Sequence, residues 1–175
     1  IRPLVSLVMN FTKPSETAPS LLTFDELETF LHEFGHALHG MLGEGKYESQ
    51  TGTNVYRDFV ELPSQLMENW AFDPEVLKQY AVHYRSNEVI PKYLVDKLRR
   101  SELFNQGFMA TELIAASLSD MDIHSITEYE PFDPMAFERK ALTEKRGLIP
   151  QIEPRYRYPY FSHIFDGGYS AGYYF

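Results

Sequence analysis

The sequence predicts a mainly α-helical protein with a short β element near the N-terminus. Apolar residues recur at intervals of three and four over residues 24–42, which indicates an amphipathic helix. Capping residues, Thr23 and Asp133, stand directly before two of the predicted helices. Apolar residues make up 43% of the 175-residue chain and aromatic residues 15%, which excludes a disordered protein.

The first two elements are a strand and a long helix. Branched apolar residues crowd the segment 3–11, which predicts the strand. Thr23 and Glu26 have the spacing of a capping box and predict the start of the helix. Gly43 fits its end, because glycine commonly follows the last helical turn.

A second helix is predicted from about residue 59 to residue 72. Pro63 either lies in its first turn or kinks it, since proline lacks the amide that a helix interior requires. Asp133 followed by Pro134 predicts another helix start. In all, further helices are expected at 74–85, 91–105, 107–120 and 134–146.

Charge and composition exclude several classes of function. The formal net charge of −9 argues against a nucleic-acid partner, because phosphate binding requires a basic face. The longest apolar runs, such as 4–9, are far shorter than the roughly 20 residues of a membrane-spanning helix. We expect a cytoplasmic protein. Since the chain has no cysteine, any metal ion must be held by histidine and carboxylate side chains.

A metal-binding motif lies inside the first predicted helix. His32-Glu33-Phe34-Gly35-His36 places two histidines one helical turn apart, so that both can grip one ion. Neutral imidazole suits zinc. Glu33 is rotated by about 100° from His32 around the helix axis and can border the metal without binding it. There it can act as the general base that takes a proton from a water held by the metal.

A catalytic zinc ion needs a third protein ligand. The arrangement with a third histidine six residues further on is excluded, because Leu42 occupies that position. Asp58, Glu61 and Glu68 are the acidic candidates on the second helix, and Glu61 is favoured because its apolar neighbours leave it in need of a cation. Glu68 either accepts a hydrogen bond from a ligand histidine or is a solvated carboxylate, and His39 is expected to line the cleft or to form a hydrogen bond.

Three stretches carry a resemblance to a known family. Residues 30–40, 51–54 and 57–65 resemble the thimet oligopeptidase family of zinc peptidases. The resemblance implies one zinc ion per chain, held by His32, His36 and Glu61, with Glu33 as the base. It also implies that residues 1–175 are a single zincin-type catalytic subdomain from a much longer, two-lobed oligopeptidase. We therefore expect short peptides and the remainder of its own polypeptide as partners.

The C-terminal segment extends the resemblance. Residues 160–174 are similar to the substrate loop of the family, which implies that His163, Tyr169 and Tyr173 contact the peptide and the oxyanion. The alternative is a tyrosine-rich packing segment. Similarity to the peptidyl-dipeptidase branch implies release of C-terminal dipeptides, with internal cleavage or a non-catalytic metal-binding domain as alternatives. Candidate side chains for binding the substrate carboxylate are Arg57, Arg155 and Arg157, with a structural pair with Asp58 as the alternative for Arg57.

Overall fold

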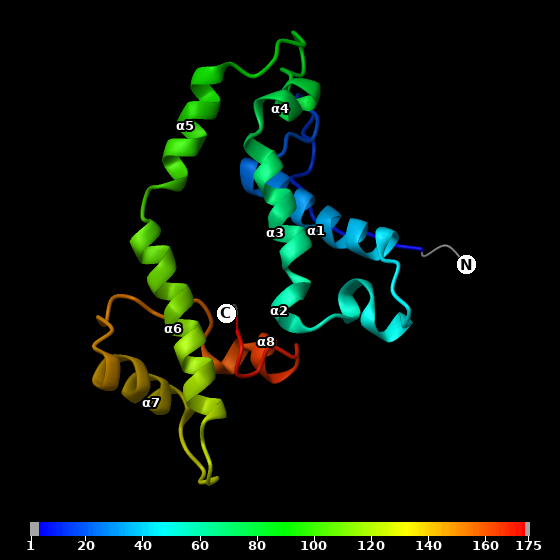
Figure 1. Ribbon diagram of the computed structural model, residues 1–175. Coiled ribbons are helices and arrows are strands. Elements are labelled where there is room, and N and C mark those ends of the chain that lie inside the picture. Colours follow the sequence, from blue (N-terminus) through cyan, green and yellow to red (C-terminus); the bar gives the residue numbers. More distant parts are fainter. Residues whose placement is uncertain (1–3, 174–175) are drawn as a thin grey trace. The chain divides into compact units, whose positions relative to one another are not determined.

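The computed structural model describes residues 4–173, and the chain divides into two compact units, Ile1–Ser101 and Glu102–Phe175. Regular structure in the described residues is helical (Figure 1), which confirms the mainly α prediction. None of the described helices is long and apolar enough to cross a membrane. That the chain acts as a single catalytic subdomain stays a prediction.

The first unit is built around α1 (Phe24–Leu42), which packs across α3 (Leu62–Glu68) as Figure 1 shows. The predicted capping box is present: the Thr23 hydroxyl accepts a hydrogen bond from the Glu26 amide, and the Glu26 carboxylate accepts one from the Thr23 amide. These bonds satisfy backbone donors that the first helical turn leaves without partners. This unit also contains α4 (Pro74–Tyr80) and all but the last residue of α5 (Lys92–Glu102).

The predicted second helix is divided into two parts. The helix α2 (Arg57–Val60) ends at Glu61, and α3 begins at the next residue, with Pro63 in its first turn. Of the two alternatives for this proline, the structure contains the first-turn position, where its missing amide costs no helical bond. A 3-10 helix, Asn69–Phe72, continues α3 to the predicted end.

The predicted strand at 3–11 is wrong for the residues that the structure describes. Residue 3 lies outside them, and residues 4–11 are extended without any partner strand. Their side chains alternate as a strand would require, but Leu4 and Val8 are 99% and 92% exposed. A strand forms only where a neighbouring strand takes up its backbone hydrogen bonds. Here the segment runs beside α1 instead, with the Thr12 amide 2.6 Å from the Glu26 carboxylate.

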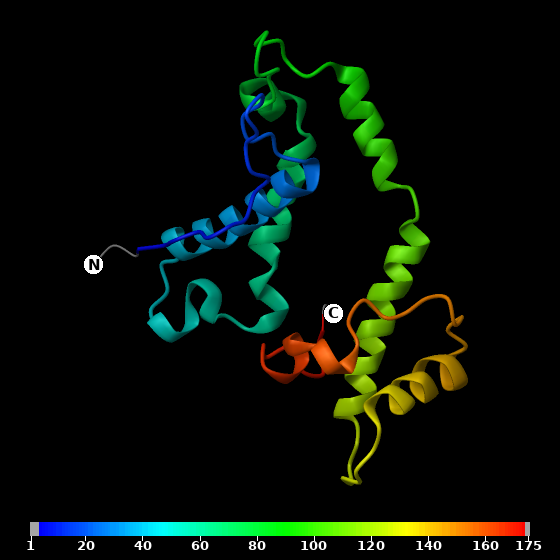
Figure 2. The same ribbon diagram turned by 180° about the vertical axis from the view of Figure 1, so that it is seen from behind.

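The second unit contains α6 (Gln106–His124), α7 (Pro134–Arg139) and α8 (Ser162–Phe165), seen from behind in Figure 2. Asp133 caps α7 as predicted, and a π-helical turn, Lys140–Glu144, continues it. The core of this unit is aromatic. Its buried residues are Ala116, Tyr158, Phe161, Ile164 and Tyr173.

Candidate metal centre

Two histidines project from one face of α1. His32 and His36 are a single turn apart, and their ring centroids lie 4.9 Å from each other with the rings nearly perpendicular. Both side chains are partly buried, with exposed fractions of 22% and 18%. The helix thus presents two imidazole nitrogens, the Nε2 atoms, toward the same point.

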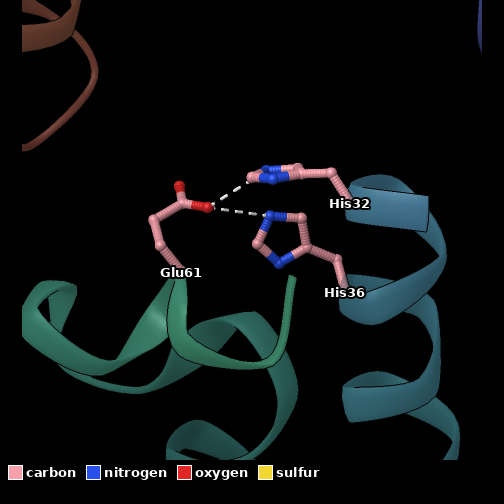
Figure 3. A group of neighbouring side chains, drawn as sticks. All are labelled: His32, His36 and Glu61. Carbon is pink, nitrogen blue, oxygen red and sulfur yellow. Dashed lines mark ion pairs between the residues drawn. The ribbon is translucent and has the colours of Figure 1, made fainter. Parts of the chain in front are cut away.

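Glu61 completes the group from the junction between α2 and α3. One carboxylate oxygen, Oε2, lies 3.2 Å from Nε2 of His32 and 3.2 Å from Nε2 of His36 (Figure 3). These three side chains can hold a metal ion, since their ligand atoms all lie within 4.8 Å of one another. Glu61 lies where the helix is interrupted, after Val60 of α2 and before Leu62 of α3.

Glu68 fixes the orientation of the His32 ring. Its Oε1 atom lies 2.6 Å from Nδ1 of His32, so of the two alternatives for this residue the structure contains the histidine contact. A carboxylate only accepts hydrogen bonds, so Nδ1 must carry the proton. In the neutral ring this leaves the lone pair on Nε2, which is the form that binds a metal.

The donor set fits zinc. A cation shared by Nε2 of His32 and the Glu61 carboxylate would account for their approach, because a neutral Nε2 that carries the lone pair can bind a metal but cannot donate to the carboxylate. A separation of 3.2 Å is also longer than the roughly 2.7–2.9 Å of a charge-assisted hydrogen bond. By contrast, two ligands about 2.0–2.1 Å from a tetrahedral zinc ion are about 3.3 Å apart. Assignment of these residues as ligands remains a prediction that this geometry supports.

Close helix packing brings Glu61 to the histidines. A Cβ atom at Gly35 would lie 2.6 Å from the Pro63 carbonyl oxygen and 2.6 Å from Cα of Ser64, so only glycine allows this approach. Ser64 is fully buried, and its hydroxyl lies 3.0 Å from Oε2 of Glu61 and can donate to it. The sequence interpretation did not identify Ser64. Its position about one helical turn after Glu61 could have indicated that the two side chains are in contact.

Two other predicted residues lie on α1. Glu33 is partly buried, and its role as general base stays a prediction. His39 does not belong to the metal-binding group found in the described part of the chain. Its ring contacts Phe59 edge-on at a centroid distance of 5.9 Å, and its role in lining a cleft stays a prediction.

The predicted C-terminal residues gather within the second unit. The His163 ring, on α8, lies 5.6 Å from the Tyr173 ring and 6.4 Å from the Tyr169 ring, measured between centroids. Tyr173 is only 3% exposed and packs in the aromatic core, as the packing alternative requires. The roles of all three in catalysis stay predictions.

One candidate for carboxylate binding is already engaged. Arg157 contacts the buried Glu138 at 2.8 Å and Glu153 at 2.9 Å, so its guanidinium serves the second unit as an ion-pair partner.

The sequence interpretation also missed Asp120, which is fully buried on α6. The sequence feature that could have identified Asp120 as buried is its position one turn after Ala116, on the face of α6 that carries small residues.

The comparisons with known proteins agree with this geometry. The family model described as Peptidase family M3 matches residues 2–175. Dipeptidyl carboxypeptidase of Escherichia coli (strain K12) is 46% identical over 98% of this chain, and the protein of that name from Salmonella typhimurium is 45% identical over 99%. Oligopeptidase A of Escherichia coli (strain K12) is 39% identical over 99%.

The chain spans about a quarter of the length of these relatives: 25%, 26% and 26%, respectively. The resemblance to the thimet oligopeptidase family is thereby confirmed, because that family is the one the matching model describes. The chain belongs to peptidase family M3.

Proposed function

We propose that this chain supplies the zinc centre and the general base of an enzyme that hydrolyses peptide bonds in short peptides. The observation that carries the proposal is the position of Glu61 Oε2, 3.2 Å from the Nε2 atoms of both His32 and His36. Glu33 follows His32 in the sequence and is not a member of the group that could hold the metal. A non-catalytic metal-binding domain would have no need of that base.

The residues divide the work of hydrolysis. His32, His36 and Glu61 hold the zinc ion, which when bound supplies Lewis acidity to the attacking water and the scissile carbonyl. Glu33 accepts a proton from that water and returns it to the departing nitrogen. His163 and Tyr169 are the proposed donors to the oxyanion, where one such donor contributes about 10²–10³ in rate.

The finer proposal is removal of dipeptides from free C-termini. It rests on the relatives called dipeptidyl carboxypeptidase, which are more similar to this chain than the one called Oligopeptidase A. Internal cleavage is the second candidate, favoured by the 39% identity to that oligopeptidase. We further propose that the remainder of the polypeptide contributes to peptide binding, and that the protein acts in the cytoplasm.

Matched peptides distinguish the two specificities. The full-length, zinc-loaded protein is incubated with one N-acetylated hexapeptide as its free acid and as its C-terminal amide, and products are identified by mass spectrometry. We expect dipeptides from the acid and almost no cleavage of the amide. Comparable internal cleavage of both would instead support the second candidate. A Glu33→Gln preparation controls for contaminating peptidases.

A further inference from the structure

A buried carboxylate on α6 holds the backbone of the C-terminal segment. Asp120 has no exposed surface, and its carboxylate accepts hydrogen bonds from the three consecutive amides of residues 171–173 at 2.8, 2.8 and 2.9 Å. Nδ1 of His124, one turn along the helix, lies 2.7 Å from its Oδ1. A carboxylate is costly to bury unless it is hydrogen-bonded, and these contacts meet that need.

The three amides form a turn built to receive an anion. Consecutive N–H groups that point inward make a concave binding site for negative charge. Ala171 has a φ of 56°, in the left-handed region where a Cβ atom crowds the following carbonyl. Such a conformation persists only where the surroundings impose it. Among the described residues, the Asp120 carboxylate contacts all three amides of this turn, and the Ser117 hydroxyl donates to the Tyr173 carbonyl at 2.9 Å.

This turn follows directly on the proposed substrate-facing residues. The Gly172 amide, besides contacting Asp120, donates to the Tyr169 carbonyl at 3.0 Å. The Tyr169 amide in turn donates to the His163 carbonyl at 3.0 Å. A continuous set of hydrogen bonds therefore runs from the buried carboxylate through the turn to α8.

We propose that Asp120 is a positioning residue for the peptidase site, fixing the segment that bears Tyr169 and Tyr173 beside His163. This inference rests on the proposed function, in which His163 and Tyr169 meet the substrate. Donors aimed at an oxyanion act in the transition state more than in the ground state. Loosening the turn should therefore lower kcat much more than it changes KM.

The test compares two carboxylates of the same helix in the full-length, zinc-loaded protein. Asp120→Asn keeps the size of the side chain but turns an NH₂ group toward at least one amide. Asp122→Asn is the matched control, because Asp122 pairs with Lys145 and Arg146 instead. For each variant we measure amide hydrogen exchange, zinc content, kcat and KM.

For Asp120→Asn we expect exchange at residues 167–173 to rise at least tenfold while α6 stays protected. The value of kcat should fall by about 10², the loss expected for a misplaced oxyanion donor. We expect KM to change less than about threefold and zinc content to be unchanged. For Asp122→Asn both kcat and exchange at 167–173 should stay within about threefold of wild type, because no bond to the turn is lost.

Three results would overturn the inference. Unchanged exchange at 171–173 in Asp120→Asn would show that the carboxylate does not hold the turn. An equal loss of kcat in both variants would mean that the loss comes from general destabilisation of the second unit and not from the turn. If Asp120→Asn does not fold, the exposed Ala171→Pro disrupts the same turn, because proline has no N–H and cannot adopt a positive φ. Wild-type kcat in that variant would also refute the positioning role.

A failure of the proposed function is separable from these results. A wild-type protein that binds zinc and hydrolyses no peptide would refute the peptidase activity. The hydrogen-exchange comparison between the two variants would still decide whether Asp120 holds the turn.

Discussion

Replacing Gly35 by alanine should separate Glu61 from the histidines. The new Cβ atom would lie 2.6 Å from Cα of Ser64, whereas ordinary van der Waals contact begins at 3.4 Å, so α3 must retreat by the difference, 0.8 Å. Carried over to Glu61, this movement lengthens its 3.2 Å separations from the histidine nitrogens to about 4 Å. Two ligands of one zinc ion, each about 2.0–2.1 Å away, reach such a separation only on opposite sides of the metal.

We therefore expect Gly35→Ala to weaken zinc binding by about 10²-fold, the cost of a misplacement near 1 Å. Overpacking should also lower the free energy of unfolding by about 1–3 kcal/mol. Competition against a chelator of known affinity measures the first effect, and denaturant unfolding of the metal-free protein the second. Gly107→Ala is the control: nothing lies within 4 Å of its Cβ position on α6, so zinc binding should not change. Wild-type zinc affinity in Gly35→Ala would refute this account of how the helices set the site.

Three further substitutions test separate parts of the account. Glu33→Gln should retain zinc and lose about 10²–10⁴ in kcat, and a variant within tenfold of wild type would exclude Glu33 as the base. Glu68→Ala should weaken zinc binding about 10–100-fold, because the His32 ring loses the contact that fixes its tautomer. The control Glu75→Ala removes only an exposed ion pair with a lysine and should leave zinc binding unchanged. Equal effects of the two substitutions on zinc binding would contradict the argument. Asp133→Ala should cost about 1 kcal/mol of unfolding free energy by removing the cap of α7, and no change on denaturant unfolding would mean that the cap contributes nothing.

Local signals in the sequence predicted where most of the helices begin, although the helix expected at 74–85 ends at Tyr80. The capping residues Thr23 and Asp133 form the hydrogen bonds expected of them, because a cap depends only on residues two or three positions away. Local signals also indicated that His32, His36 and Glu61 come together. The spacing of one helical turn places His32 and His36 on the same face of the helix. The apolar neighbours of Glu61 in the sequence indicated that its carboxylate needs a partner.

Features that depend on distant residues were not predictable. The strand prediction failed because a strand requires a partner strand, and apolar composition says nothing about whether one is available. The need for glycine at residue 35 follows from contact with α3, 28 residues away along the chain, which no local pattern encodes. Asp120 was missed for the same reason, since the three amides that donate to it lie 51–53 residues away.

The central claim is that one zinc ion is held by His32, His36 and Glu61. Anomalous diffraction at the zinc edge, from crystals of the zinc-loaded protein, tests it most directly. The account predicts a single strong peak about 2.0–2.2 Å from the two Nε2 atoms and a Glu61 oxygen. A peak without Glu61 among the ligands, or zinc bound only elsewhere, would contradict it.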